Sequence, residues 1–426
     1  MQKFNFVFLW LMSFISYADT PAYYDFNSGQ LILPFVNTPQ GSYSAELQLD
    51  QNSINTPLEQ FNVVKAVAVN SSIGDDQSPS FNIETGVLTL PFVVTQQGVY
   101  SATMQIAQES AKKRSGTTRF NITRVVPITP STRTQSTQGC KIFPANNVWN
   151  TPVNTLRVHS RSSAWVNTIG SAKGLWMDFG SGQWEGGTIG LPYNEVTGST
   201  IVKSSVHFSY NDESDVGPYP IPTNYKIEFG NDHHLLTIDK EACQLYELFN
   251  ARFNNTWTAD AGAIWNLNSN QLRPINWTSA DAAGLPVFPG LVRYDEVAAG
   301  FIGHAMRFTV PSSSSYIWPA RHRTAGMLNV LTNTPPFGAR FRLKANYNIS
   351  GFTPALQVIL KAMQTYGIIN ADNGSAWFIS GAPDERWDNT LLRKLTVLKG
   401  SDFEAVETAC MMVNPNSGQA DLSHCP

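Results

Sequence analysis

Residues able to move protons and to neutralise an anionic group gather in one short stretch of the chain. Arg293, Tyr294 and Asp295 are followed by His304 and Arg307 within fifteen residues. An imidazole, a phenol or a carboxyl group beside a guanidinium can serve as the acid or base of a reaction on a negatively charged substrate. We expect Tyr294, Asp295 and His304 to be catalytic and Arg293 to bind substrate. The alternating pattern that follows predicts a strand with His304 on one face and Arg307 on the other.

A second stretch combines an aromatic ring with two basic side chains. Trp318, Arg321 and His322 lie within five residues of one another. A planar guanidinium beside an indole suits a carboxylate or the face of a sugar ring. We expect Arg321 and His322 to be catalytic and Trp318 to bind substrate. The alternative is an ordinary surface loop around a packed tryptophan.

Histidines and acids elsewhere in the chain complete the candidate site. His233 and His234 begin an alternating segment, so they face opposite sides of a strand and only one of them can join a given pocket. We expect His233 to be catalytic, although a structural role is the alternative for any single histidine. Hydrolysis of a glycoside needs two carboxyl groups, for which Asp281 and Asp295 are candidates. The remaining residues expected to bind substrate are His207 and Asp372.

Metal and cofactor signals in the sequence are weak. Asp212, Glu213 and Asp215 could offer oxygen ligands to Ca²⁺, but the spacing and the final glutamate of an EF-hand are missing, and a solvated turn is the alternative. No other metal or cofactor is expected. The sequence contains no Gly-x-Ser-x-Gly, P-loop, His-Glu-x-x-His or dinucleotide-binding motif. Serine hydrolases, nucleotide-binding proteins and zinc proteases therefore lose support.

Composition and charge limit the kinds of partner. The 426 residues include 29 Lys and Arg against 32 Asp and Glu, a net charge of −3, which gives no electrostatic footprint for nucleic acid. Only 14% of residues are charged, whereas 11 Trp and 14 Tyr contribute to an aromatic content of 12%. Aromatic rings pack on the apolar faces of sugars, while polar groups bond to the sugar hydroxyls. We therefore expect an extracellular polysaccharide as the partner.

The N-terminal part of the chain contains an internal repeat. Residues 29–36 recur as 86–93, and residues 41–45 recur as 98–102, both at a distance of 57 residues. Alternating apolar residues in each copy predict half-buried strands joined by a hairpin. Because one hairpin cannot bury its own apolar face in water, we expect the two repeats to form one β-sandwich over residues 19–125.

The elements that must position the candidate residues follow a linker. Residues 126–139 are rich in Pro, Ser and Thr and predict that linker. Short alternating runs in residues 140–426 predict a large β-sandwich or jelly-roll-like domain with a few helices, so the fold class is mainly β. We expect helices over residues 354–366 and around residues 391–398. The expected strands are 201–210, 225–229, 234–239, 245–251, 306–310 and 340–345.

The first eighteen residues have the pattern of a secretory signal peptide. Lys3 precedes an apolar run over residues 4–15, and small residues follow up to Ala18. The run is shorter than the ~20 residues that a membrane-spanning helix needs. We expect cleavage after Ala18, a secreted or periplasmic protein, and no membrane insertion of the mature chain.

Four cysteines in an exported chain predict two disulfide bonds. Three pairings are possible. We favour Cys140–Cys243 together with Cys410–Cys425, because the second bond would hold a polar tail.

Five blocks of the second half are long enough to be distinctive. They are residues 143–150, 281–286, 290–296, 318–322 and 371–375. Together they resemble a widespread group of secreted microbial proteins to which no activity is assigned. The resemblance covers most of residues 140–405, after a tandem β-repeat module, and it implies domain limits and export.

The sequence as a whole predicts a secreted enzyme that cleaves a polysaccharide. In β-elimination, an arginine such as Arg321 neutralises a uronate carboxylate, and a histidine or tyrosine moves the proton. In hydrolysis, two carboxyl groups act on the glycosidic bond. The grouping of Arg, His and Tyr slightly favours elimination. The alternative is a non-catalytic extracellular protein that binds a glycan or a protein, which separation of His304, Arg321 and His322 would favour.

Overall fold

The computed structural model describes eight strands near the N-terminus and most of the chain from residue 140 on. Contacts divide the chain into two compact units, Met1–Thr129 and Pro130–Pro426. The expected signal peptide lies outside the described residues. Within the part that is described, no helix is long and apolar enough to cross a membrane. The described residues are 22–25, 30–38, 41–49, 60–69, 80–82, 87–95, 98–106, 119–127, 136–137, 140–313, 315–324 and 333–425.

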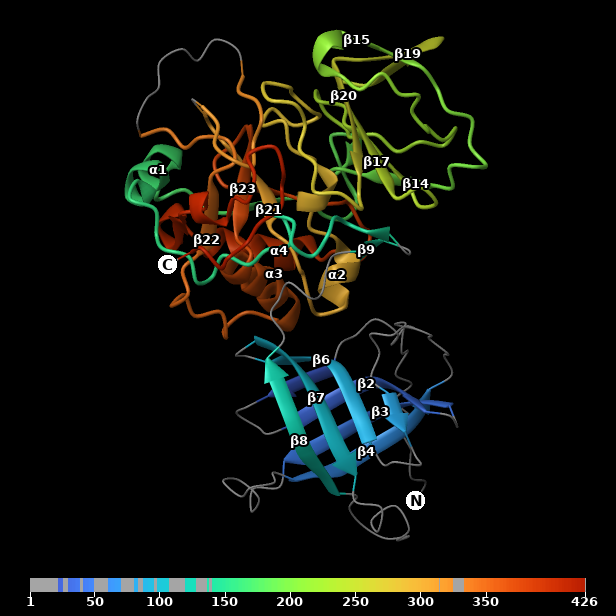
Figure 1. Cartoon of the computed structure of the whole chain (residues 1–426), viewed down its shortest axis with the longest axis vertical. Helices are drawn as coiled ribbons and strands as arrows, with labels where there is room; N and C mark the ends of the chain where they lie inside the picture. Colours follow the sequence, from blue (N-terminus) through green and yellow to red (C-terminus); the bar gives the residue numbers. More distant parts are fainter. Residues whose placement is uncertain are drawn as a thin grey trace, which may run out of the picture. The chain divides into compact units, whose positions relative to one another are not determined.

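The strands of the first unit form one sheet (Figure 1). Its order is β1-β2-β3-β4-β8-β7-β6-β5, and the sheet closes on itself because β1 also pairs with β6 and β2 with β5. The strands are β1 (Ala22–Asp25), β2 (Gln30–Thr38), β3 (Gly41–Leu49), β4 (Gln60–Val69), β5 (Ser80–Asn82), β6 (Val87–Thr95), β7 (Gly98–Ile106) and β8 (Arg119–Pro127).

The two hairpins that contain the sequence repeat have matching pairings. β2 pairs with β3 and β6 pairs with β7, both antiparallel, and the register shifts after Leu33 in the first hairpin and after Leu90 in the second. The short strands β1 and β5 each pair with both β2 and β6. The mainly β class is confirmed. A sandwich built from two repeats stays a prediction.

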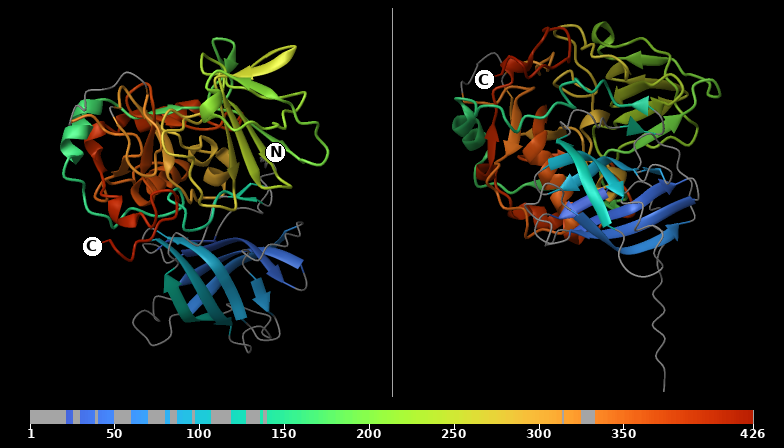
Figure 2. Two further views of the ribbon diagram at one scale, coloured as in Figure 1. Left: turned by 45° about the horizontal axis from the view of Figure 1, so that its top comes forward. Right: turned by 60° about the horizontal axis from the view of Figure 1, so that its bottom comes forward.

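The second unit contains sheets of six, four and three strands among its described residues (Figures 1 and 2). The six-stranded sheet has the order β11-β24-β21-β23-β22-β25, and the four-stranded sheet the order β14-β16-β17-β20. The six-stranded sheet consists of β11 (Trp176–Asp178), β21 (Met306–Val310), β22 (Arg340–Leu343), β23 (Ile368–Asn373), β24 (Phe378–Ser380) and β25 (Phe403–Ala405). The four-stranded sheet consists of β14 (Tyr193–Val196), β16 (Leu235–Asp239), β17 (Gln244–Phe249) and β20 (Ala261–Asn266).

Shorter strands complete the second unit. The three-stranded sheet has the order β15-β19-β18 and consists of β15 (Val206–Phe208), β18 (Arg252–Asn254) and β19 (Thr256–Ala259). Two further pairs are β9 (Ser136–Thr137) with β10 (Cys140–Lys141), and β12 (Gln183–Trp184) with β13 (Gly187–Thr188). Both β9 and the end of β8 fall within the expected linker at 126–139. The domain limits predicted from the sequence stay a prediction.

Helices are few and short, as the sequence predicts. The expected helix at 354–366 is present as α3 (Pro354–Thr365), with a proline in its first turn and Gly367 in a left-handed conformation (φ 71°) after its end. The other α-helices are α1 (Ser162–Ile169), α2 (Tyr294–Ala298) and α4 (Asn389–Arg393). Single 3₁₀ turns occur at η5 (Asn211–Glu213), η6 (Phe288–Gly290), η7 (Lys394–Val397), η8 (Gly400–Asp402) and η9 (Ala409–Met411).

One expected strand is replaced by a side-chain contact. Residues 225–229 do not pair as a strand. Instead, the Asn194 side chain accepts a hydrogen bond from the backbone N–H of Lys226 (2.7 Å) and donates one to its carbonyl oxygen (2.9 Å). An amide side chain thus satisfies the backbone groups that a neighbouring strand would otherwise pair. The expected strand at 201–210 is shorter, and only β15 remains of it.

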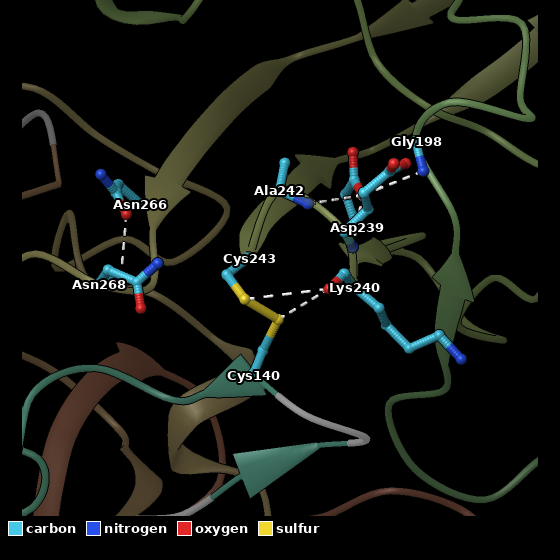
Figure 3. The surroundings of a disulfide bond; sticks show 9 residues. Cys140, Gly198, Asp239, Lys240, Ala242, Cys243, Asn266 and Asn268 are labelled. Atoms are coloured by element: carbon cyan, nitrogen blue, oxygen red, sulfur yellow. Dashed lines mark hydrogen bonds between the residues drawn. A yellow bond between two sulfur atoms is a disulfide. The ribbon is translucent and has the colours of Figure 1, made fainter.

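Both favoured disulfide bonds are present. Cys140 of β10 is bonded to Cys243 in the turn between β16 and β17 (Figure 3), and Cys410 is bonded to Cys425. The Asp239 carboxylate supports the turn that carries Cys243, because it accepts hydrogen bonds from the backbone N–H groups of Glu241 and Ala242 within the turn and of Gly198 after β14. The predicted pairing is confirmed.

Removal of the longer-range disulfide should cost more stability. The Cys140–Cys243 bond spans 103 residues and the Cys410–Cys425 bond spans 15. Loop entropy assigns them about 4.7 and about 3 kcal/mol, so replacing the first pair by Ser should lower the free energy of unfolding by about 1 to 2 kcal/mol more than replacing the second. Tryptophan fluorescence in urea measures this in the second unit, which contains every Trp except Trp10. A larger loss from the second pair would contradict the expectation.

Candidate functional site

Neighbouring strands of the six-stranded sheet place polar side chains on one face. Asp178 of β11 is the Cα partner of Ser380 of β24. Phe308 of β21 is the partner of Ile379, which sets Arg307 opposite Ser380. Paired residues point to the same side of a sheet. Asp178, Ser380 and Arg307 therefore share a face, although they are far apart in the sequence.

A register shift adds Asp372 to this face. β23 runs parallel to β21, and the pairing slips by one residue after Phe308, so that Thr309 has Asp372 as its partner. Thr309 faces the same side as Arg307, because residues two apart in a strand share a face. Without the shift, Ala371 would be the partner and Asp372 would point to the opposite face.

The Arg307 guanidinium is the centre of the contacts on this face. Its side chain is only 5% exposed. Nε donates a hydrogen bond to the Asp281 carboxylate at 2.7 Å, and Nη2 donates to the second oxygen of that carboxylate. Nη2 also lies 3.2 Å from the Asp372 carboxyl group, and Nη1 donates to the Ser380 hydroxyl. Asp281 is fully buried, so each charge of this ion pair depends on the other for its stability.

A second ion pair lies against the first. The His234 imidazole contacts the Glu228 carboxylate through Nδ1 (2.5 Å) and the Ala280 carbonyl oxygen through Nε2 (2.8 Å). Because both ring nitrogens face acceptors, both are donors and the ring is an imidazolium. His234 is 2% exposed, whereas the Glu228 side chain is 20% exposed and reaches solvent. We refer to Asp178, Glu228, His234, Asp281, Arg307, Asp372 and Ser380 as the Arg307 cluster.

The Asp372 carboxyl group differs from an ordinary aspartate. Burial, and next the charge of Asp281, raise its pKa to about 7, although Arg307 opposes the shift. Its side chain is still 22% exposed. Burial and the nearby Glu228 also raise the pKa of Asp178. A carboxyl group that keeps its proton near neutral pH and reaches solvent can act as a general acid.

Glu228 has the opposite character. Burial acts to raise the pKa of Glu228, but the His234 imidazolium outweighs it, so the pKa of this carboxyl group is lowered. Burial acts to lower the pKa of His234, and the ion pair with Glu228 reverses this and raises it to about 9. The cluster therefore keeps the partly exposed Glu228 ionised, while the partly exposed Asp372 retains its proton up to about pH 7. Such a divided pair is the arrangement that acid–base catalysis needs.

Exposed aromatic rings lie next to Glu228 and at one end of β11. Phe229 follows Glu228 directly and is 48% exposed. A Cβ atom on Gly187 would collide with its ring, so Phe229 packs against the β12–β13 hairpin. That hairpin carries Trp184, which is 68% exposed. Trp176, at the other end of β11 from Asp178, is stacked on Phe378 with 5.9 Å between the ring centroids.

Two predicted residues form a separate buried network. His304 is completely buried and contacts Glu296 through Nε2 (3.1 Å) and the Ala305 carbonyl oxygen through Nδ1 (2.7 Å). Arg293 donates to the other oxygen of Glu296 at 2.6 Å and to the carbonyl oxygens of Phe288 and Leu291. This network ties the start of α2 to the entry of β21. Both residues have structural contacts and neither belongs to the Arg307 cluster.

Tyr294 and Asp295 lie at the molecular surface around Arg386. The Asp295 side chain is 76% exposed and is paired with the Arg386 guanidinium at 2.7 Å. The same guanidinium lies 4.3 Å from the centre of the Tyr294 ring, which packs edge-on against Trp387. Asp281 and Asp295, the acids expected to act together, are therefore a buried and an exposed group with different partners.

Trp318 and Arg321 hold the C-terminal segment. The Trp318 indole donates to the Ser417 carbonyl oxygen at 2.8 Å. Arg321 donates to the Pro415 carbonyl oxygen at 2.6 Å and to the Asn416 side chain at 2.8 Å. The guanidinium of Arg321 is buried among neutral acceptors, which satisfy its donors.

The other candidate residues lie in separate loops and strands. His322 contacts the Ala282 carbonyl oxygen (2.9 Å) and lies 3.8 Å from Glu213. His233 has a left-handed backbone (φ 45°), and its neighbour His234 is the imidazole that joins the cluster. His207 is exposed on β15.

The acidic loop expected to offer calcium ligands has protein partners. Asp215 pairs with Arg273 at 2.6 Å, and Glu213 accepts a hydrogen bond from the backbone of Thr278. In the described ranges, no group of three His, Cys, Asp or Glu residues gathers in a way that could hold a metal ion.

The sequence identified part of the cluster and missed the rest. Asp281 and Asp372 were expected, and the separation of His304 from Arg307 agrees with the predicted alternation. Its other members are Asp178, Glu228, His234, Arg307 and Ser380, which were not among the expected site residues. The sequence pointed to one of these members only through Asp232-His233-His234, and that pattern did not show whether His233 or His234 enters the site.

Comparisons with family models, curated proteins and solved structures found no match to this chain. The resemblance to secreted microbial proteins stays a prediction. The Arg307 cluster is therefore the basis on which a class of function can be proposed.

The His234–Glu228 pair should make stability depend on pH. Because the folded-state pKa of His234 (about 9) lies above its ordinary value of 6.5, the stabilisation is complete below pH 6.5 and is lost as the pH rises through about 9. Urea unfolding of the wild type at pH 6.5 and 9.5, followed by tryptophan fluorescence, should show a loss of roughly 3 kcal/mol. His234→Gln should remove most of this difference, and the exposed control His207→Gln should preserve it. The same difference in wild type and His234→Gln would contradict the assignment.

Proposed function

We propose that this protein hydrolyses glycosidic bonds in an extracellular polysaccharide, and that the Arg307 cluster is its catalytic site. The observation that carries the proposal is the presence of two partly exposed carboxyl groups held in opposite protonation states. Asp372 lies against Arg307 and the ionised Asp281, and Glu228 lies against the His234 imidazolium. Glycoside hydrolysis requires one carboxylic acid and one carboxylate on either side of the bond.

The neighbouring groups support a distinct role for each carboxyl group. Asp372 donates its proton to the leaving glycosidic oxygen, and the Arg307 guanidinium at 3.2 Å then stabilises the carboxylate that forms. Glu228 accepts a proton from the attacking water. The products are one new hydroxyl group and one new reducing end. Asp281, Ser380 and His234 are positioning residues, because they act on the substrate only through Arg307 and Glu228.

The positions of the basic residues favour hydrolysis over the β-elimination that the sequence slightly favoured. Elimination needs a guanidinium able to neutralise a uronate. Arg321 donates to backbone and amide acceptors, and Arg307 is already balanced by Asp281. His304 is completely buried and contacts Glu296, which is a partner of neither Arg307 nor Arg321.

Other features agree with an exported enzyme that acts on sugars. Two disulfide bonds fit an oxidising compartment, as the expected signal peptide does. The exposed rings of Trp184 and Phe229 could stack on the apolar faces of sugar rings beside Glu228. Under this proposal, the N-terminal unit, predicted as a sandwich of two repeats, is a spacer or a glycan-attachment module.

A non-catalytic glycan-binding protein is the second candidate. The separation of His304, Arg321 and His322 into different contact networks favours it. A binding protein is also consistent with the buried, structural contacts of His304 and Arg321, because it needs neither residue for catalysis. The two candidates differ in a measurable way, because only the first produces reducing ends.

Hydrolysis can be tested by incubating residues 19–426 with a panel of polysaccharides. We expect new reducing ends without the ultraviolet absorbance of unsaturated uronates. Asp372→Asn and Glu228→Gln should each lower kcat by about 10²- to 10⁴-fold, the usual range for an acid or base. The matched control Asp295→Asn removes an exposed carboxyl group and should keep the activity. The rate should fall as the pH rises above about 7, where Asp372 loses its proton.

Two results would contradict the proposal. Ultraviolet absorbance rising together with reducing ends would indicate elimination. Retention on an immobilised glycan without either product, for every substrate of the panel, would favour the binding protein.

A further inference from the structure

A pocket of about 550 Å³ lies in the second unit and shares no residue with the Arg307 cluster. This volume is in the range of small-molecule sites in proteins. Segments from distant parts of the sequence form its walls, at residues 159–165, 315–321, 334–336 and 407–415, together with Ile275. The lining includes His159, Trp165, Trp318, Glu407 and Ala409.

The wall formed by the C-terminal segment is held rigidly. The Trp318 indole and the Arg321 guanidinium donate to the carbonyl oxygens of Ser417 and Pro415. The Cys410–Cys425 disulfide lies beside the lining residue Ala409 and closes the same segment covalently. A pocket whose walls are fixed before binding loses little entropy when a ligand enters. The two residues that the sequence assigned to a site thus build this pocket rather than the Arg307 cluster.

A stacked pair of rings lines another side. The His159 and Trp165 rings lie 4.2 Å apart with an angle of 19° between their planes. His159 Nδ1 accepts a hydrogen bond from the backbone of Arg161, so Nε2 carries the proton and faces the Glu407 carboxylate at 3.5 Å. The Glu407 side chain is 45% exposed. It retains acceptor capacity toward solvent, because a carboxylate accepts several hydrogen bonds.

We propose that this pocket binds a neutral sugar unit of a glycan. Its lining combines aromatic and aliphatic side chains with hydrogen-bonding groups, including Glu407, Arg161 and hydroxyl-bearing residues. A hydrocarbon ligand would cover those polar groups without giving them partners, which costs free energy. A sugar offers apolar C–H faces to the rings and hydroxyl groups to the polar atoms. The lining also contains Arg321, but its guanidinium already donates to the carbonyl oxygens of Arg273 and Pro415 and to the Asn416 side chain. The remaining charges, on Arg161 and Glu407, are opposite and favour neither an anionic nor a cationic sugar.

This inference shares the glycan chemistry of the proposed function, but not its residues. It assigns the pocket a binding role that does not require bond cleavage. Binding at the pocket and cleavage at the Arg307 cluster can therefore fail independently of each other.

The test is calorimetric titration of residues 19–426 with neutral trisaccharides, namely cellotriose, xylotriose, maltotriose and tri-N-acetylchitotriose, and with trigalacturonate. We expect at least one neutral trisaccharide to bind more tightly than trigalacturonate. Ala409→Trp fills the pocket from an exposed position, so it should fold and should weaken that binding at least tenfold. Glu407→Gln should weaken it several-fold. Ala172→Trp, at an exposed residue outside the lining, is the matched control and should bind like the wild type.

Asp372→Asn separates the two proposals. We expect it to lose hydrolysis and to bind the same trisaccharide with unchanged affinity. Unchanged affinity in Ala409→Trp, or loss of binding in Asp372→Asn, would place the ligand elsewhere and overturn the inference. Failure of all four neutral trisaccharides to bind the wild type at millimolar concentration would also overturn it, whatever the result of the reducing-end assay.

Discussion

The buried ion pair between Arg307 and Asp281 is the interaction on which the proposed site depends. Neither side chain has access to enough water to be stable as an ion alone, so each must keep the other in place. Arg307 lies on the central strand β21, and Asp281 lies on the loop that follows the four-stranded sheet. The pair therefore joins the two parts of the second unit at the point where the exposed carboxyl groups gather.

The same burial that makes this pair necessary also prepares its neighbours for chemistry. Asp281 takes the charge of Arg307, so a second carboxyl group in the same low-dielectric surroundings keeps its proton to a higher pH, as Asp372 does. Glu228 has a cation of its own in His234 and stays ionised. Asp372 and Glu228 have similar ordinary pKa values, but their different neighbours shift these values in opposite directions. The one-residue register shift in β23 places Asp372 on the face that carries Arg307.

Local signals in the sequence predicted local structure well. The N-cap position and apolar face of α3, the positions of β16, β17, β21 and β22, and the two disulfide pairs agree with the structure. The alternation in these strands did not predict that nearly all of their residues are buried. The site was harder to predict because its members come from six separate segments, which meet only through sheet order and a register shift. No spacing pattern encodes that shift. Arg321 was misleading for a related reason, since the sequence shows a charge but not the carbonyl oxygens of residues 273 and 415 that receive it.

The central claim is that the buried pair keeps Asp372 protonated near neutral pH, and this can be measured on the residue itself. Protein labelled with ¹³C at the aspartate carboxyl carbons is titrated by NMR, and the spectrum of Asp372→Asn identifies the Asp372 resonance by its absence. The account predicts a titration midpoint near pH 7. A midpoint near the ordinary value of about 4 for an aspartate would contradict it, because Asp372 would then be ionised where the reaction needs an acid.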